Sequence, residues 1–374
     1  MHKNTSPQAI ESERGRVVRS FRPSRIILPV LLGVAAVAYL FYWQFDSRQF
    51  RAIEWTWRTF AWIGLAVLVL LLRHLFYTLR LHTITGSVFS WRKCLKFIVF
   101  WEFSAALTPT SKGGPFVMLF VLTRENLSAG RTAAAIFYTM ALDSAFFIIT
   151  LPLLLSVYGP PMLYPGMKRF GDVGLASGTF FVTYGLMASY LLVLVFFLLI
   201  RPRYAKTALG WLAARPVLKR WSPRLLLLGE EFELAAREMR LRDWRYHLKV
   251  VIGTVGAWTC KFVMINCLII AVVPSIPVDG ATQAFIYARL VAMFTIMAFS
   301  PTPGGAGLAE LALVGFISDY VPRGVGLVVA LLWRGMAYYG YLLTGAIIVP
   351  GWVAAKLGKR EELPAEAPGG GTGV

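Results

Sequence analysis

Cysteine, histidine and acidic residues are scarce in this sequence, and none of them has the spacing of a common metal site or catalytic motif. The chain of 374 residues contains 3 cysteines, 4 histidines and 19 acidic residues. It has no CxxC pair, no His-Glu-x-x-His, no Gly-x-Ser-x-Gly and no phosphate-binding loop. The few acids in apolar segments are dispersed rather than paired for acid–base work. We therefore expect no metal site, no cofactor and no enzymatic activity.

Hydrophobic residues make up 57% of the chain and charged residues only 15%. Apolar windows of about 18 residues or more are long enough to cross a bilayer as helices. The sequence thus predicts an all-α integral membrane protein. Six full spans are expected, at residues 26–43, 57–72, 132–157, 177–200, 250–273 and 325–349. The first span is expected to stay in the protein rather than to be removed as a signal peptide, because no small-residue cleavage site follows it.

Two further apolar segments, 94–122 and 283–317, are each interrupted by proline and consecutive glycines. The breaks are residues 108–114 and 300–307. A membrane helix cannot include such a stretch as regular structure. The apolar arms after the breaks reach only about 12 and 15 Å at ~1.5 Å per residue, against a hydrocarbon core of roughly 30 Å. We predict two re-entrant hairpins; the alternative is ordinary helices kinked at proline.

Basic residues orient this arrangement. Lys and Arg concentrate in residues 1–25, 73–96 and 201–249, whereas the loops expected outside contain few. By the positive-inside rule both termini are cytoplasmic, in the cytoplasmic membrane. Basic loops beside anionic headgroups also account for most of the net charge of +19, so no nucleic-acid partner is needed.

The two halves show the same order of elements. A shift of 192 residues places Pro109 on Pro301. It also carries helix 57–79 onto 249–271 and helix 132–157 onto 324–349, with opposite senses across the bilayer. This predicts an inverted-topology repeat within a transmembrane domain at 26–350. Its parts are repeat one (57–157), a connector helix (177–200), a cytoplasmic loop (201–249) and repeat two (250–349).

The flanking segments are polar. Residues 1–25 form a basic cytoplasmic segment, and residues 351–374 are expected to be a disordered cytoplasmic tail. Within the loop 201–249, residues 224–243 have apolar side chains at helical spacing. This stretch is either an amphipathic helix on the inner leaflet or a helix that caps the bundle from below.

Seven charged residues lie inside apolar segments or at the breaks. They are Glu102, Lys112, Asp143, Lys261, Arg289, Glu310 and Arg334. Each unsatisfied charge would cost about 2.5–3.5 kcal/mol at the bilayer centre, so they must pair or face a wet cavity. Asp143 and Arg334, in repeat-equivalent helices, are predicted to form an ion pair that either locks the helices together or contacts substrate. Arg289 and Lys261 either contact substrate or extend to an interface.

The breaks themselves favour an anion. Exposed backbone amides and the start of a half-helix attract negative charge. Lys112 and Glu310, within or just after the glycines, are therefore expected to belong to a binding site.

Residues 300–310, Ser-Pro-Thr-Pro-Gly-Gly-Ala-Gly-Leu-Ala-Glu, resemble the Pro-x-Pro-Gly-Gly-x-Gly-x-x-Glu signature of the lysylphosphatidylglycerol synthase transmembrane-region family. That family is the flippase-like module of the multiple peptide resistance factor, also found as stand-alone proteins. Arg334 resembles its last-helix arginine, and Asp143 falls where it often carries an acid. Residues 104–115 followed by 122–124 resemble a variant of its first motif. The similarity covers roughly 25–350.

Two departures accompany this resemblance. Pro115 and Met118 stand where many members have an acid and an arginine. The aminoacyltransferase domain of the bifunctional relatives is not expected in this chain, so lipid aminoacylation is not expected either.

The residues and the resemblance together predict a lipid translocase that moves an anionic or phosphate-bearing lipid, phospholipid or polyprenyl-linked, between leaflets. The alternatives are a proton-coupled transporter of a small polar solute and, third, a membrane-embedded enzyme acting on lipid-linked sugars. Expected partners are membrane lipids; a separate lipid-modifying enzyme and a homo-oligomer stay open. The predicted substrate-binding residues are Glu102, Thr108, Pro109, Lys112, Gly113, Gly114, Asp143, Arg289, Pro301, Thr302, Gly304, Gly305, Gly307, Glu310 and Arg334.

Overall fold

The computed structural model describes residues 55–108, 113–169, 175–298, 300, 302 and 304–358. Helices dominate these residues, and none of them forms a strand. The α-helices are α4 (Trp57–Ile84), α5 (Trp91–Leu107), α6 (Gly113–Arg124), α7 (Ala129–Tyr158), α8 (Leu175–Val195), α9 (Pro202–Ala213), α10 (Ser222–Arg240), α11 (Trp244–Val272), α12 (Gly280–Met297), α13 (Leu308–Phe316), α14 (Arg323–Arg334) and α15 (Gly340–Gly358). Short 3-10 or π turns are η1 (Pro160–Met162), η2 (Phe196–Ile200), η3 (Pro216–Trp221) and η4 (Gly335–Tyr339).

Six helical stretches in the described part of the chain are long and apolar enough to cross a membrane. They are Trp57–Ile84, Ala129–Tyr158, Gly178–Ile200, Trp244–Val272, Gly280–Met297 and Arg323–Val353. Five of them contain or largely overlap predicted spans, and the sixth is the first arm of the second predicted hairpin. The predicted span at 26–43 lies outside the described residues. The prediction of an all-α membrane protein is confirmed.

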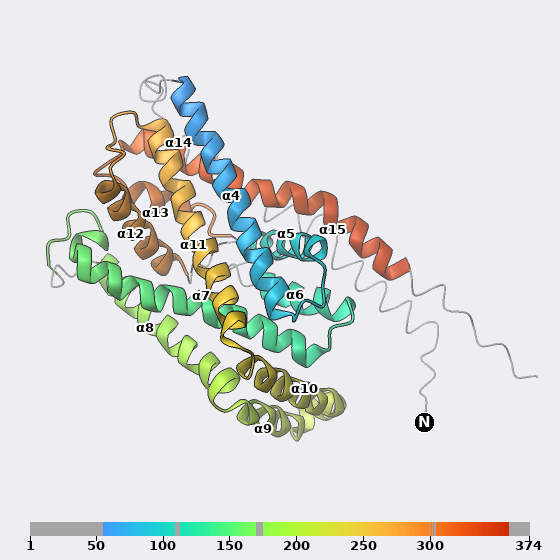
Figure 1. Ribbon diagram of the computed structural model, residues 1–374. Helices are drawn as coiled ribbons and strands as arrows, with labels where there is room; N and C mark the ends of the chain where they lie inside the picture. Colours follow the sequence, from blue (N-terminus) through green and yellow to red (C-terminus); the bar gives the residue numbers. More distant parts are fainter. Residues whose placement is uncertain are drawn as a thin grey trace, which may run out of the picture.

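Helices α4 and α11 lie side by side (Figure 1). At one end Nη1 of Arg58 donates to the carbonyl oxygen of Pro274 across 3.1 Å. Further along, a Cβ added at Gly256 would lie 2.7 Å from the ring of Phe76, so the backbones approach closely. The pairs 58 with 274 and 76 with 256 show that these helices run antiparallel. The inverted repeat requires this of its two equivalent helices, and the repeat itself stays a prediction.

Helix α4 is longer than predicted. Its 28 residues span about 42 Å at ~1.5 Å per residue, and it continues to Ile84 rather than ending near residue 72. Arg73 and Arg80 are therefore not in a cytoplasmic loop, as predicted for residues 73–96, but are buried at 3% and 5% exposure. Hydropathy falls at Arg73-His74, yet the helix continues because carboxylates on other helices pair with both guanidinium groups.

Both interrupted segments fold back on themselves. Helix α5 packs against α6, and α12 packs against α13. Lys93, at the start of α5, forms an ion pair of 3.0 Å with Glu125, just after the end of α6. Glu125 also accepts a hydrogen bond of 3.0 Å from the indole of Trp352 in α15. The entry and exit of the first hairpin thus adjoin the last helix. A re-entrant hairpin is defined by its depth in the bilayer, so the re-entrant character of both hairpins stays a prediction.

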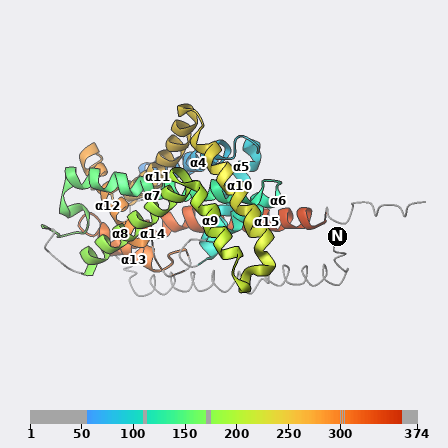
Figure 2. The ribbon, with the colours of Figure 1, turned by 90° about the horizontal axis from the view of Figure 1, so that it is seen from below.

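Helices α9 and α10 form the lower end of the bundle in Figure 1, and the view from below shows them nearest the viewer (Figure 2). α10 packs tightly on the start of α7, where a Cβ at Gly130 would lie 2.2 Å from Cβ of Glu231. The carboxylate of Glu231 accepts the main-chain N–H of Gly130 at 2.9 Å. Phe232 and Ala236 of the same helix are buried. Of the two alternatives for residues 224–243, this packing favours the helix that caps the bundle.

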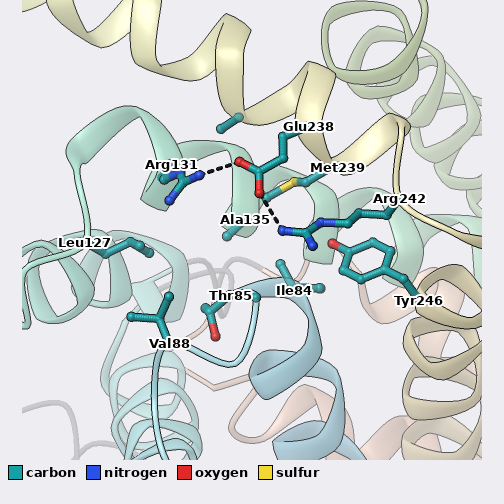
Figure 3. Close-up of a pocket in the computed structure, with 12 residues that line it drawn as sticks. Ile84, Thr85, Val88, Leu127, Arg131, Ala135, Glu238, Met239, Arg242 and Tyr246 are labelled. Carbon is teal, nitrogen blue, oxygen red and sulfur yellow. Dashed lines mark hydrogen bonds and ion pairs between the residues drawn. The ribbon is translucent and has the colours of Figure 1, made fainter.

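A small pocket of about 110 Å³ lies at this junction (Figure 3). Arg131 of α7 and Arg242, just after α10, both bind the carboxylate of Glu238, the latter at 2.5 Å. These ion pairs connect α7, α10 and the start of α11 beside the end of α4.

The last helix also extends beyond its predicted end. α15 continues to Gly358, into the segment predicted as a disordered tail, and Trp352 packs edge-on against Phe100 of α5. This contact explains why the chain stays helical past Pro350. The predicted disorder of residues 359–374 and the basic segment 1–25 lie outside the described residues.

Candidate functional site

The two breaks touch each other. The main-chain N–H of Gly304 donates to the carbonyl oxygen of Thr108 at 3.4 Å. Beside this contact, the hydroxyl of Tyr338 donates to the carbonyl oxygen of Ala106 at 3.2 Å. The second break therefore closes on the end of α5 and on the π turn η4. Side chains next to both breaks can face one shared space.

Glycine is required where the second break makes this approach. Gly304 has a φ of +55°, and a Cβ there would lie 2.3 Å from the ring of Tyr338. Gly305 and Gly307 also have positive φ, at +71° and +81°. Side chains rarely tolerate such backbone. At the other break, a Cβ on Gly114 would lie 2.9 Å from the indole nitrogen of Trp101, so α6 lies directly against α5.

Next to the breaks lies a cavity of about 320 Å³. Helices α4, α5, α7, α8, α11, α12, α13 and α14 and the π turn η4 contribute to its wall, together with Ser300, Gly304 and Gly305. Aromatic lining residues are Phe147, Trp258, Phe294, Trp333 and Tyr338, and the charged ones are Arg73, Glu102, Asp143, Lys261 and Arg334. An apolar wall with a few converging charges is the usual composition of a ligand site.

On the α4 side of the cavity, two arginines neutralise two acids. Arg73 binds Glu102 of α5 at 2.6 Å, and Arg80 binds Asp143 of α7 at 2.5 Å. The indole N–H of Trp258 also donates to Asp143 at 2.9 Å. Both guanidinium groups stack on the ring of Tyr77, 4.9 and 4.7 Å from its centroid. Such pairing is what allows the carboxylates to stay charged within the apolar bundle.

On the opposite side, Arg334 binds Glu310. Nε of Arg334 donates to Glu310 Oε1 at 2.6 Å, and Nη1 donates to the carbonyl oxygen of Gly304 at 2.9 Å. The two side chains are only 6% and 1% exposed. Glu310 thereby links the start of α13 to α14, and Arg334 holds the second break. In the described part of the chain, Arg334 Nη2 and Glu310 Oε2 are buried with no hydrogen-bond partner.

The predicted ion pair between Asp143 and Arg334 is wrong. Both side chains line the same cavity, but each is already neutralised by another residue, Asp143 by Arg80 and Arg334 by Glu310. The physical reason is that α4 continues to Ile84 instead of ending in a loop, and this places Arg80 where its guanidinium group pairs with Asp143.

Lys261 has a different environment. It comes from α11, lines the cavity, and its ammonium lies 4.6 Å from the ring centroid of Trp258 and 4.3 Å from that of Phe294. Among the described residues Lys261 forms no ion pair, and the nearby carboxylates of Glu102, Asp143 and Glu310 are each bound to an arginine. Aromatic faces stabilise a cation but do not neutralise it.

Arg289 is not part of this cavity. It is 2% exposed and forms an ion pair with Asp319, and it donates to the carbonyl oxygens of Phe316 and Pro161, each at 3.2 Å. These bonds connect α12 to the end of α13 and to η1. The prediction that Arg289 contacts the substrate is therefore wrong. Its guanidinium group instead connects three segments of the structure.

The other predicted site residues surround the breaks. Thr108 follows α5, and its hydroxyl donates to the carbonyl oxygen of Ser104 at 2.9 Å. Gly113 begins α6 and Gly307 precedes α13. The hydroxyl of Thr302 lies 3.2 Å from that of Ser300, which lines the cavity. Pro109, Lys112 and Pro301 lie outside the described residues.

Sequence reasoning did not select Arg73, Arg80 or Trp258 as site residues, and it left Lys261 undecided. A signal for the arginines exists: Arg73, Tyr77 and Arg80 are spaced by four and three residues and so lie on one face of a continuing helix. No comparable pattern marks Trp258, because its role depends on the position of Asp143 in another helix.

Comparisons with known proteins agree with this architecture. The family model of the lysylphosphatidylglycerol synthase TM region matches residues 26–345. A UPF0104 membrane protein of Archaeoglobus fulgidus is 24% identical over 340 residues, covering 86% of this chain and 95% of that protein. No solved structure matches the chain. Because the family model covers both breaks and the cavity between them, the chain is a multi-pass membrane protein that belongs to the lysylphosphatidylglycerol synthase transmembrane-region family.

Proposed function

We propose that this protein is a lipid translocase that moves an anionic, phosphate-bearing lipid between the leaflets of the cytoplasmic membrane. The observation that carries the proposal is the cavity beside the two touching breaks. It contains Lys261, which forms no ion pair with any carboxylate among the described residues. The chain also belongs to a family that is identified with a flippase-like module. This membership supports a lipid as the substrate.

The charges at the cavity favour an anionic ligand. Arg73, Arg80 and Arg334 are each matched by one carboxylate, and Lys261 is the additional cation. A buried charge without a counterion is unfavourable, so an anion entering the cavity would relieve that cost. A phosphate group of a lipid headgroup would supply the missing charge.

The surroundings suit acyl chains. Large apolar side chains such as Phe116, Leu192 and Ile347 are exposed on the outer surface at 74%, 68% and 79%. In a bilayer these surfaces contact lipid. The headgroup would bind the charged side chains of the cavity, while the tails would stay in the surrounding lipid.

The proposed topology places both termini in the cytoplasm and opens the hairpin 94–122 to the cytoplasm and the hairpin 283–317 to the outside. The antiparallel pairing of α4 and α11 and the proximity of Lys93, Glu125 and Trp352 support it. In an inverted repeat the site lies where the halves meet, and rocking of one half exposes it to either side. Neither catalysis nor nucleotide use is part of the proposal.

The test is reconstitution into vesicles that contain labelled lipids. Phospholipids of different headgroups and polyprenyl phosphates are offered in separate preparations, and uptake of soluble solutes and of protons is measured in parallel. We expect at least one anionic lipid to cross much faster than in protein-free vesicles. If every lipid moves at the protein-free rate while a soluble solute enters with protons, the protein is a solute transporter and the proposal is wrong.

A further inference from the structure

Lys261 is the one basic residue of the cavity wall that no carboxylate neutralises in the described part of the chain. The other charged side chains there form closed pairs, Arg73 with Glu102, Asp143 with Arg80 and Arg334 with Glu310. Lys261 has only the ring faces of Trp258 and Phe294 beside its ammonium. Among the described residues of the cavity wall and their partners, the positive charges therefore exceed the negative charges by one.

This excess specifies the charge of a complementary ligand. A ligand with a single negative charge brings the cavity to neutrality. A zwitterionic headgroup brings no net charge and leaves the ammonium without a full counterion. A phosphomonoester carries about −1.5 to −2 at neutral pH, which leaves negative charge in excess. Uncompensated charge in a low-dielectric site is costly in either case.

We infer that the cavity selects a lipid phosphodiester of net charge −1 and that Lys261 binds its phosphate. The inference rests on the lipid substrate of the proposed function and narrows it to one class. A glycerophospholipid with a neutral alcohol headgroup has this chemistry, and so has a polyprenyl phosphodiester. Both lipid classes carry the phosphodiester anion, and the experiment below tests each class separately.

The donors available fit a phosphodiester. Its two non-bridging oxygens accept hydrogen bonds, and the lysine ammonium offers three donors on a flexible stem. Arg334 also lines the cavity, and its Nη2 is buried without a partner, so this N–H can serve the second oxygen. Trp258 keeps the ammonium in place from α11 itself, since the two residues are one helical turn apart.

The experiment measures binding separately from transport. The full-length protein in a neutral detergent is titrated with four water-soluble lipids: short-chain phosphatidylglycerol, phosphatidylcholine and phosphatidic acid, and a short-chain polyprenyl phosphodiester. The rise in thermal unfolding temperature with lipid concentration gives an apparent affinity for each. The variants are Lys261→Met and Lys261→Arg. The matched control is Lys249→Met, an exposed lysine on the same helix outside the cavity wall.

We expect wild type to bind the two phosphodiesters of charge −1 at least about tenfold more tightly than phosphatidylcholine and phosphatidic acid. Lys261→Met should lose this preference, whereas Lys261→Arg and Lys249→Met should keep it. Lys261→Met should also unfold at a higher temperature than wild type without lipid, because an unpaired buried charge is removed. If one of the two phosphodiesters binds and the other does not, the source is identified and the inference stands.

Equal affinity of wild type for phosphatidylglycerol and phosphatidylcholine would overturn the inference, and this result needs no variant. Retention of the full preference by a folded Lys261→Met would overturn it as well. These outcomes leave the proposed function untouched if vesicles still show lipid movement. Conversely, a clear phosphodiester preference without any movement in vesicles would contradict the translocase and support the binding site.

Discussion

The main-chain N–H of Gly304 reaches the carbonyl oxygen of Thr108 across 3.4 Å, so the second glycine break is hydrogen-bonded to the first. The contact joins two segments from opposite halves of the chain. Beside it, the hydroxyl of Tyr338 donates to the carbonyl oxygen of Ala106, so the end of α5 lies against the π turn that follows Arg334. π turns inside helices often occur at functional sites. The cavity lies beside this contact, and Gly304 is part of its wall.

Gly304→Ala should destabilise the protein. The backbone there is left-handed, and the new methyl group would collide with the ring of Tyr338. We expect a loss of roughly 1–3 kcal/mol from backbone strain alone, visible as a lower unfolding temperature in detergent. Gly185→Ala in α8 is the control, because no atom lies within 4 Å of the added Cβ. Equal stability of the two variants would show that Gly304 is not constrained by this contact.

Glu310 and Arg334 should show strong energetic coupling. Glu310→Gln or Arg334→Met alone leaves one buried charge unpaired, which costs roughly 3–5 kcal/mol, whereas the double variant should regain much of the loss. A double-mutant cycle of unfolding free energies measures this coupling. The control is the same cycle on Asp143 and Arg334, for which we expect much weaker coupling. Stronger coupling in the second cycle would restore the pair predicted from sequence.

Arg289→Met should reduce stability without changing lipid binding. Its guanidinium joins α12 to Asp319 and to two backbone carbonyls away from the cavity. We expect a lower unfolding temperature and an unchanged preference among lipids per folded molecule. Asp319→Asn, which removes the partner charge, should behave in the same way. A selective loss of anionic-lipid binding in Arg289→Met would place this residue in the substrate path.

Side-specific labelling of single cysteines tests the two hairpins. In a background without Cys94, Cys260 and Cys267, four exposed positions are chosen. Thr123→Cys lies at the end of α6 and Thr207→Cys in α9, whereas Ser275→Cys and Ser318→Cys lie in the turns after α11 and α13. We expect the first two to react only from the cytoplasmic side and the last two only from outside. Reaction of the residue 123 cysteine from outside would mean that α5 and α6 together cross the membrane, and the inverted repeat would fail.

Five of the predicted spans and the two breaks agree with the structure, because their signals in the sequence are local. Apolar length marks a span, and proline with consecutive glycines marks a backbone that no membrane helix tolerates. The end of α4 was misplaced for the same reason: local hydropathy falls at Arg73, and only partners on α5 and α7 keep the following turns helical and buried.

The pairing of charges could not be predicted in this way. Asp143 has two candidate partners of the same chemistry, and the choice of Arg80 over Arg334 depends on how α4, α7 and α14 are rotated about their axes. The position of α10 is a similar case. Its apolar face suits either a membrane surface or a bundle, and the absence of a side chain at Gly130 allows it to pack on α7.

The rate at which a labelled, singly charged anionic phospholipid crosses the bilayer of reconstituted vesicles tests the central claim most directly. Wild type is compared with two variants. Ala298→Trp adds a large side chain to the cavity wall at the end of α12, and Ala281→Trp adds the same side chain at the exposed start of that helix. We predict rapid movement with wild type and Ala281→Trp, and a rate close to that of protein-free vesicles with Ala298→Trp. Movement by a folded Ala298→Trp at the wild-type rate would contradict passage of the headgroup through this cavity.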